Sequence, residues 1–131
     1  MKSNIWRDTL NGMNLLLGSI PFRIVYDKNM CRRFDTMGQI NYHENIIYLD
    51  PDFHERDTLQ VILHELIEFI NRNHELGLPH QVITALETGL MNIIMQNPHL
   101  FSIFVDEAQR DVFENVGGKD NEEEENNITT A

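Results

Sequence analysis

Cysteine and positive charge are scarce in this chain. Cys31 is the one cysteine among 131 residues, so no disulfide can form within the chain and nothing indicates an oxidising compartment. Lysine and arginine number 10 against 21 aspartates and glutamates, which gives a formal net charge of −11. Because a nucleic-acid-binding protein needs a basic surface to meet the phosphates, this balance predicts no direct binding to nucleic acid.

Long apolar runs are absent as well. No run approaches the roughly 20 residues that cross a bilayer, which predicts no association with a membrane. Arg7, Asp8 and Asn11 interrupt the start of the chain, which therefore lacks the apolar core of a signal peptide. We therefore expect a cytoplasmic protein. The length and the 41% hydrophobic content predict a globular domain that buries a core without disulfides.

The acidic charge is concentrated near the end of the sequence. Residues 106–131 hold nine acids and two bases, so they carry −7 of the net charge. The stretch GGKDNEEEENNITTA, residues 117–131, has too few apolar side chains to offset the entropy cost of folding. We predict a single domain over residues 1–116 and a disordered acidic tail over residues 117–131.

The first part of the chain has the patterns of a small sheet. Trp6–Ile20 is typical of a short helix that ends near Gly18, and Pro21–Lys28 has the β-branched character of a strand. Two further strands, Gln39–Tyr42 and Ile46–Asp50, would form a hairpin around a HEN turn. These strands predict a small antiparallel sheet.

Helical spacing dominates the rest of the chain. A long helix is predicted over Glu55–Asn73, with Asp52 or Asp57 as the cap. A second helix is predicted over His80–Gln96 and a last one after Pro98. The expected fold class is α+β, a small antiparallel β-sheet or hairpin packed on a core of three to four helices.

The run VILHELIEFIN, residues 61–71, places three ionisable side chains in an apolar helix. His64 and Glu68 are four residues apart and share one face, while Glu65 lies about 100° round the helix. A carboxylate in apolar surroundings is strongly penalised unless a cation or a donor accompanies it. A divalent metal would satisfy His64 and Glu68 together, and zinc binds both ligand types. In the ordinary alternative, His64 hydrogen-bonds to the sheet and both glutamates reach water.

Four stretches in order carry a resemblance to a known family. They are NIIYLDP, TLQVILHELIEFI, HQVITALETGL and QNPHL, and together they cover about Gly38–Phe101. In this order and spacing the chain resembles zincin-type metallopeptidase domains, and more narrowly small phage and prophage zincin-like proteins. The resemblance implies a zincin-like helical core, a bound Zn²⁺ and a protein or peptide as substrate or partner.

The chain departs from the family pattern at two positions that compensate each other. The usual second histidine of the helix motif is Glu68 here, and the usual glutamate of the next helix is His80. The resemblance therefore implies a metal site of His64, Glu68 and His80, two imidazoles and one carboxylate as before. His74 is the alternative third ligand, because it follows His64 at the spacing of the extended zincin motif. Glu87 lies two turns beyond His80 on the same helix face; we expect an ordinary surface residue, and the alternative is a residue that supports a ligand.

The implied activity is hydrolysis of peptide bonds through a metal-activated water. Glu65 would be the catalytic general acid and base. The hairpin edge, Asn45–Tyr48, would align an extended peptide, and Tyr42, Tyr48 or Arg72 would stabilise the transition state. The alternative is a catalytically inactive, metal-stabilised binding module of phage or mobile-element origin that acts on a protein partner.

Overall fold

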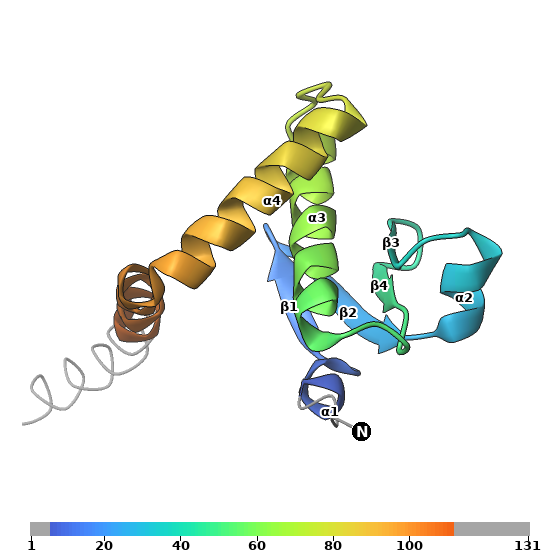
Figure 1. The fold of residues 1–131 in the computed structure, drawn as a ribbon, viewed down its shortest axis with the longest axis horizontal. Coiled ribbons are helices and arrows are strands. Elements are labelled where there is room, and N and C mark those ends of the chain that lie inside the picture. Colours follow the sequence, from blue (N-terminus) through green and yellow to red (C-terminus); the bar gives the residue numbers. More distant parts are fainter. Residues whose placement is uncertain (1–5, 112–131) are drawn as a thin grey trace, which may run out of the picture. The chain divides into compact units, whose positions relative to one another are not determined.

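The computed structural model describes residues 6–111, which form a four-stranded sheet followed by helices (Figure 1). The chain divides into two compact units, Met1–Met91 and Asn92–Ala131. The predicted acidic tail over residues 117–131 lies outside the described residues, and the single domain predicted over residues 1–116 stays a prediction. Among the described helices, none combines the length and the apolar character that crossing a membrane requires.

The sheet belongs to the first unit and is mixed. Its strands are β1 (Asn14–Leu17), β2 (Ile20–Tyr26), β3 (Gly38–Asn41) and β4 (Ile46–Leu49), in the spatial order β1-β2-β4-β3. The pairs β1–β2 and β3–β4 are antiparallel, but β2 and β4 run parallel. The α+β class is therefore confirmed. The sheet was expected to be antiparallel throughout, but it contains one parallel pair: β4 lies between β2 and β3, parallel to β2 and antiparallel to β3.

The helix predicted over Trp6–Ile20 is wrong. Only Arg7–Leu10 is helical (α1), and the following apolar residues form strand β1. Leu17 pairs with Ile20, which leaves a two-residue turn whose first residue, Gly18, has φ of 62°. Glycine at that position with positive φ is what a tight hairpin turn requires. The apolar run before Gly18 is so short that its spacing of apolar residues cannot distinguish a helix from a strand.

A short helix, α2, follows β2 and was not predicted. It spans Lys28–Arg33, and the Asp27 side chain caps it by accepting hydrogen bonds from the backbone N–H groups of Asn29 and Met30 at 3.0 and 3.1 Å. Six residues are too few to show a helical period, so only the cap residue signals this helix.

The two long helices have the predicted bounds. They are α3 (Glu55–Asn73) and α4 (His80–Gln96), and residues 98–111 are helical as expected after Pro98. The predicted cap is wrong, because His54 rather than an aspartate accepts a hydrogen bond from the Arg56 backbone N–H.

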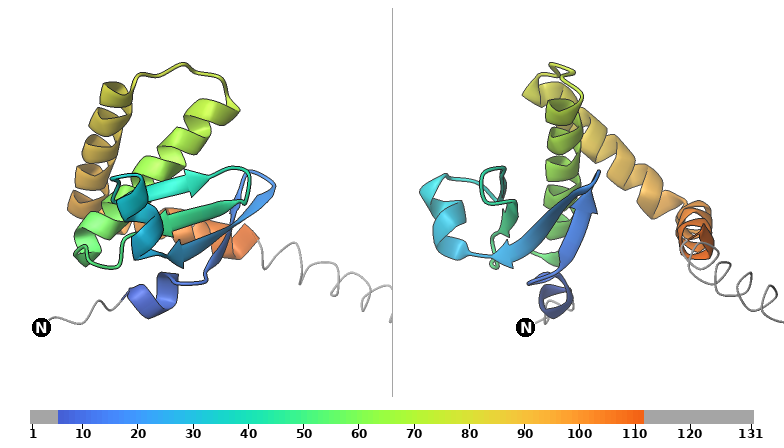
Figure 2. Two further views of the ribbon diagram at one scale, coloured as in Figure 1. Left: turned by 90° about the vertical axis from the view of Figure 1, so that its right-hand side faces the viewer. Right: turned by 180° about the vertical axis from the view of Figure 1, so that it is seen from behind.

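Helix α3 packs across one face of the sheet (Figure 2). The core beneath it consists of Leu10, Leu17, Phe22, Ile24, Ile47, Leu49 and Phe69. Val61, Ile62 and Leu66 add the facing side of α3. At helical spacing this face also includes Glu65, whereas His64 and Glu68 lie on the flank beside it. The fold thus buries one of the three ionisable residues and leaves the other two at the rim.

Strand β3 lies close to α3 at Gly38. A β-carbon at this position would meet the Val61 side chain and come within 3.3 Å of the Tyr48 carbonyl oxygen. We expect Gly38→Ala to lower the free energy of unfolding by about 1–3 kcal/mol, the usual cost of overpacking, as measured by urea denaturation. Gly89→Ala is the matched control, because nothing lies within 4 Å of a β-carbon there. Equal stability of the two variants would contradict the close approach.

Candidate metal centre

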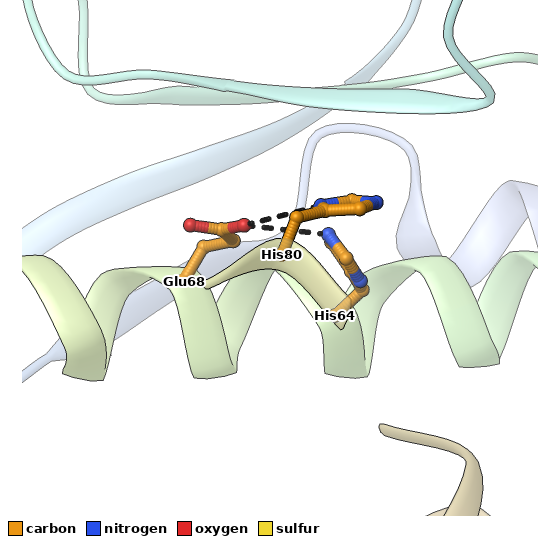
Figure 3. Close-up of side chains that lie close together, drawn as sticks. All are labelled: His64, Glu68 and His80. Carbon is orange, nitrogen blue, oxygen red and sulfur yellow. Dashed lines mark ion pairs between the residues drawn. The ribbon is translucent and has the colours of Figure 1, made fainter. Parts of the chain in front are cut away.

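Three side chains from α3 and the start of α4 converge at the rim of the core (Figure 3). His64 Nε2 lies 3.5 Å from Glu68 Oε1, and His80 Nδ1 lies 4.0 Å from the same oxygen. The two imidazole centroids are 5.2 Å apart. One ligand atom from each of the three residues lies within 4.8 Å of the other two, so the group can hold a metal ion.

The donor set and its spacing fit a small divalent ion. Tetrahedral ligands at about 2.0–2.2 Å from a zinc ion lie about 3.4 Å from one another. The separation of 3.5 Å between His64 and Glu68 is already close to that value. The His80 side chain is 79% exposed, so the group opens to solvent on the side of α4. Two imidazoles and one carboxylate leave a fourth position free for water or substrate.

Glu87 stands behind His64 and is not the surface residue that the sequence predicted. Its Oε2 lies 2.9 Å from His64 Nδ1, and its side chain is 11% exposed. A carboxylate on one ring nitrogen orients a histidine and makes the other nitrogen a better ligand. Here Nδ1 is taken by Glu87, which leaves Nε2 directed at Glu68. The position of Glu87 two turns beyond His80 allowed a supporting role near the ligands, but no local pattern pairs it with His64, which is 23 positions away on another helix.

We expect Glu87→Gln to weaken metal binding by about 10–100-fold, since the amide cannot stabilise the positive charge shared by His64 and the metal. Competition with a chromophoric chelator would measure the dissociation constant. Glu75→Gln, an exposed change in the loop between the helices, is the control and should leave the constant unchanged. An unaltered constant in Glu87→Gln would show that this hydrogen bond does not support metal binding.

His74, the alternative third ligand, is not part of the converging group. It is the exposed C-terminal cap of α3. Asn71 stays within the helix and closes the following loop through two hydrogen bonds with the Leu78 backbone, at 2.9 and 3.3 Å. The left-handed residues of that loop are Glu75 and Gly77 instead. The chain therefore turns after His74 and brings His80 to the site.

Glu65 is buried beside the three donors, with 8% of its surface exposed. Burial raises the pKa of Glu65 to about 7. The His64 imidazole lowers this pKa, Glu68 raises it further, and a hydrogen bond to the Ile40 backbone lowers it. A carboxyl group that titrates near neutral pH can both accept and release a proton under physiological conditions, which is the property of a general acid and base.

The raised pKa makes the stability of the metal-free protein depend on pH. The folded state holds the Glu65 proton up to about pH 7, but the unfolded state releases it near the ordinary value of 4.5. Stability should therefore fall as the pH rises through this window, by about 3 kcal/mol for this group. Urea denaturation with a chelator at pH 5 and pH 8 would measure the difference. Glu65→Gln should remove most of it, and an unchanged difference would contradict the assignment.

The site residues line two adjoining hollows of about 430 and 230 Å³. His64, Glu65 and His80 line both hollows. Glu87 lines the larger one, and Tyr42 lines the smaller one. A substrate in this space would contact the candidate metal ligands and the buried carboxyl together.

Two sequence-based expectations about the surroundings are wrong. The segment Asn45–Tyr48 is not at the sheet edge, because β4 pairs with β2 on one side and β3 on the other. The free edge at the site is β3, and Gly38 and Ile40 from it line the smaller hollow. Tyr48 lines neither hollow, and its hydroxyl lies 3.3 and 3.4 Å from the Glu44 carboxylate oxygens.

Comparisons with known proteins add no family to this description. No protein-family model, curated protein or solved structure matches the chain.

Proposed function

We propose that this protein is a zinc-dependent peptidase of the zincin type, in which His64, Glu68 and His80 hold the metal. One observation supports this most strongly. Three donors converge at a hollow that also contains a buried carboxyl, Glu65, which is not one of the donors. A purely structural metal site has no need for a fourth ionisable group that titrates near neutral pH. The arrangement thus separates metal binding from proton transfer, as hydrolysis requires.

The proposed chemistry divides the work among named residues. When bound, zinc would act as a Lewis acid on a substrate carbonyl and lower the pKa of water. Glu65 would take the proton of the attacking water and release it to the departing amine. The free edge of β3 would align an extended peptide along the hollow by strand addition. Burial raises the pKa of the Tyr42 phenol, so this hydroxyl stays protonated and can donate a hydrogen bond.

Two measurements on the purified full chain test the proposal. Elemental analysis should find one zinc ion per chain. A mixed peptide library should be cleaved by the zinc-loaded protein, and mass spectrometry would identify the products. A chelator should stop cleavage, and added zinc should restore it. Protein that binds no metal even after incubation with zinc would overturn the proposal.

The second candidate function is a catalytically inactive, metal-stabilised binding module of phage or mobile-element origin. An exposed apolar row on α4 favours binding to a protein partner, since Val82, Leu86 and Leu90 repeat at helical spacing. The proposed origin rests on the sequence resemblance alone. Bound zinc that raises the melting temperature without any cleavage of the library would favour this function over the peptidase.

A further inference from the structure

A third hollow, of about 290 Å³, lies beside the candidate metal centre within the first unit. Its apolar part is formed by Ile20, Phe22 and Phe69. The two phenylalanine rings meet edge to face at 5.8 Å between centroids and are themselves buried. This wall is therefore a rigid continuation of the core that opens to solvent, the kind of surface that accepts an apolar side chain.

The polar part of this hollow contains a cation, the side chain of Arg72. The Arg72 guanidinium lies over the Tyr42 ring at 4.1 Å from its centroid. Within residues 6–111 Arg72 takes part in no ion pair, although the chain carries a net charge of −11. Stacking on the ring holds the planar guanidinium and leaves its N–H groups available for a carboxylate. The side-chain amides of Asn45 and Asn73 add further hydrogen-bonding groups.

Two observations place this hollow near the metal centre. Arg72 follows Glu68 by one helical turn, so the two positions are about 6 Å apart along the axis of α3. Tyr42 lines both this hollow and the smaller hollow at the metal centre. An extended peptide advances about 3.3 Å per residue. A group held at Arg72 is therefore about two residues from the candidate metal.

We infer that this hollow binds the C-terminal residue of a peptide, with its α-carboxylate on Arg72 and an apolar side chain against Phe22 and Phe69. An α-carboxylate and an apolar side chain branch from the same carbon, which matches a cation beside an apolar wall. An aspartate or glutamate side chain within a longer peptide offers the carboxylate but not the adjacent apolar group. If the proposed peptidase function holds, this binding site would direct cleavage to within the last two or three residues of a peptide. That consequence rests on the proposed function.

Peptide binding to the metal-free protein tests this inference without any need for turnover. The probe is Ala-Ala-Ala-Ala-Phe with a free carboxylate, compared by calorimetry in the presence of chelator with the same peptide as its C-terminal amide. We expect the free acid to bind about 10–100-fold more tightly, as a charge-assisted pair with arginine implies. Equal affinity for acid and amide would overturn the inference.

Substitutions of Arg72 complete the test. Arg72→Gln should abolish the preference for the free acid, and Arg72→Lys should keep part of it because the charge remains without the planar fork. Arg56→Gln, an exposed change on the same helix, is the control and should keep the whole preference. Circular dichroism would establish that each variant is folded. A preference that survives in Arg72→Gln would contradict the assignment.

The peptide-binding measurements and the cleavage assay together distinguish failure of this inference from failure of the proposed function. A free-acid preference in a protein that binds no zinc would retain the carboxylate site and refute the peptidase. Zinc-dependent cleavage without that preference would retain the peptidase and refute the site.

Discussion

Glu65→Gln is expected to lower peptide hydrolysis by about 10²–10⁴-fold while zinc binding is retained. Glutamine has the same size but cannot take a proton from water, so the variant loses the general base alone. Glu65 is not one of the three converging donors, which is why metal content should not change. Initial rates on a cleaved library peptide, together with elemental analysis of the same preparation, would measure both effects.

The stability of this variant provides an internal control. At neutral pH glutamine should be tolerated at least as well as glutamate, because burial disfavours the ionised form of Glu65. A variant that is folded and zinc-loaded but inactive would support proton transfer by this residue. Full activity in such a protein would exclude Glu65 as the general base of the reaction.

His80→Ala is expected to weaken zinc binding by more than about a hundredfold and to abolish hydrolysis. The loss of a direct ligand should exceed the 10–100-fold effect that is typical when only the partner of a ligand is removed. Because the His80 side chain is 79% exposed, its removal leaves the core intact, and the metal-free variant should unfold at the same urea concentration as the metal-free parent. Competitive zinc titration would measure the affinity.

Two further histidine variants, His74→Ala and His64→Ala, serve as controls for His80→Ala. His74 caps α3 through its backbone, so alanine there should change neither stability nor zinc affinity. His64→Ala should remove zinc binding and also destabilise the metal-free protein, because Glu87 would remain buried without its partner at 2.9 Å. If His74→Ala lowered zinc affinity as much as His80→Ala, the assignment of the third ligand would be wrong.

The sequence alone was sufficient for the long helices and for part of the site. Helices α3 and α4 have the predicted bounds because a helical repeat over 17 or more residues is a local property that neighbouring structure rarely overrides. The pairing of His64 with Glu68 follows from the same repeat, since residues four apart share a helix face. The approach of His80 was expected from the family resemblance, and the structure brings the three side chains together.

The short elements could not be predicted in the same way. Strand β1 has four residues and helix α2 has six, and such lengths do not show a period that separates a helix from a strand. Their conformation is decided by partners: β1 by its pairing with β2, and α2 by the Asp27 cap. The parallel pairing of β2 with β4 joins segments far apart in the chain, so no local pattern encodes it.

The sequence by itself determined that an apolar helix carries one histidine and two glutamates, and which of these share a face. Only the tertiary structure decided what each one meets. It placed Glu87 on His64, directed Glu65 toward the edge of β3, and set Arg72 over Tyr42 beside an apolar hollow. The physical reason is that helical periodicity depends on neighbours three and four residues away, whereas partners of charged groups are chosen when separate elements pack and exclude water.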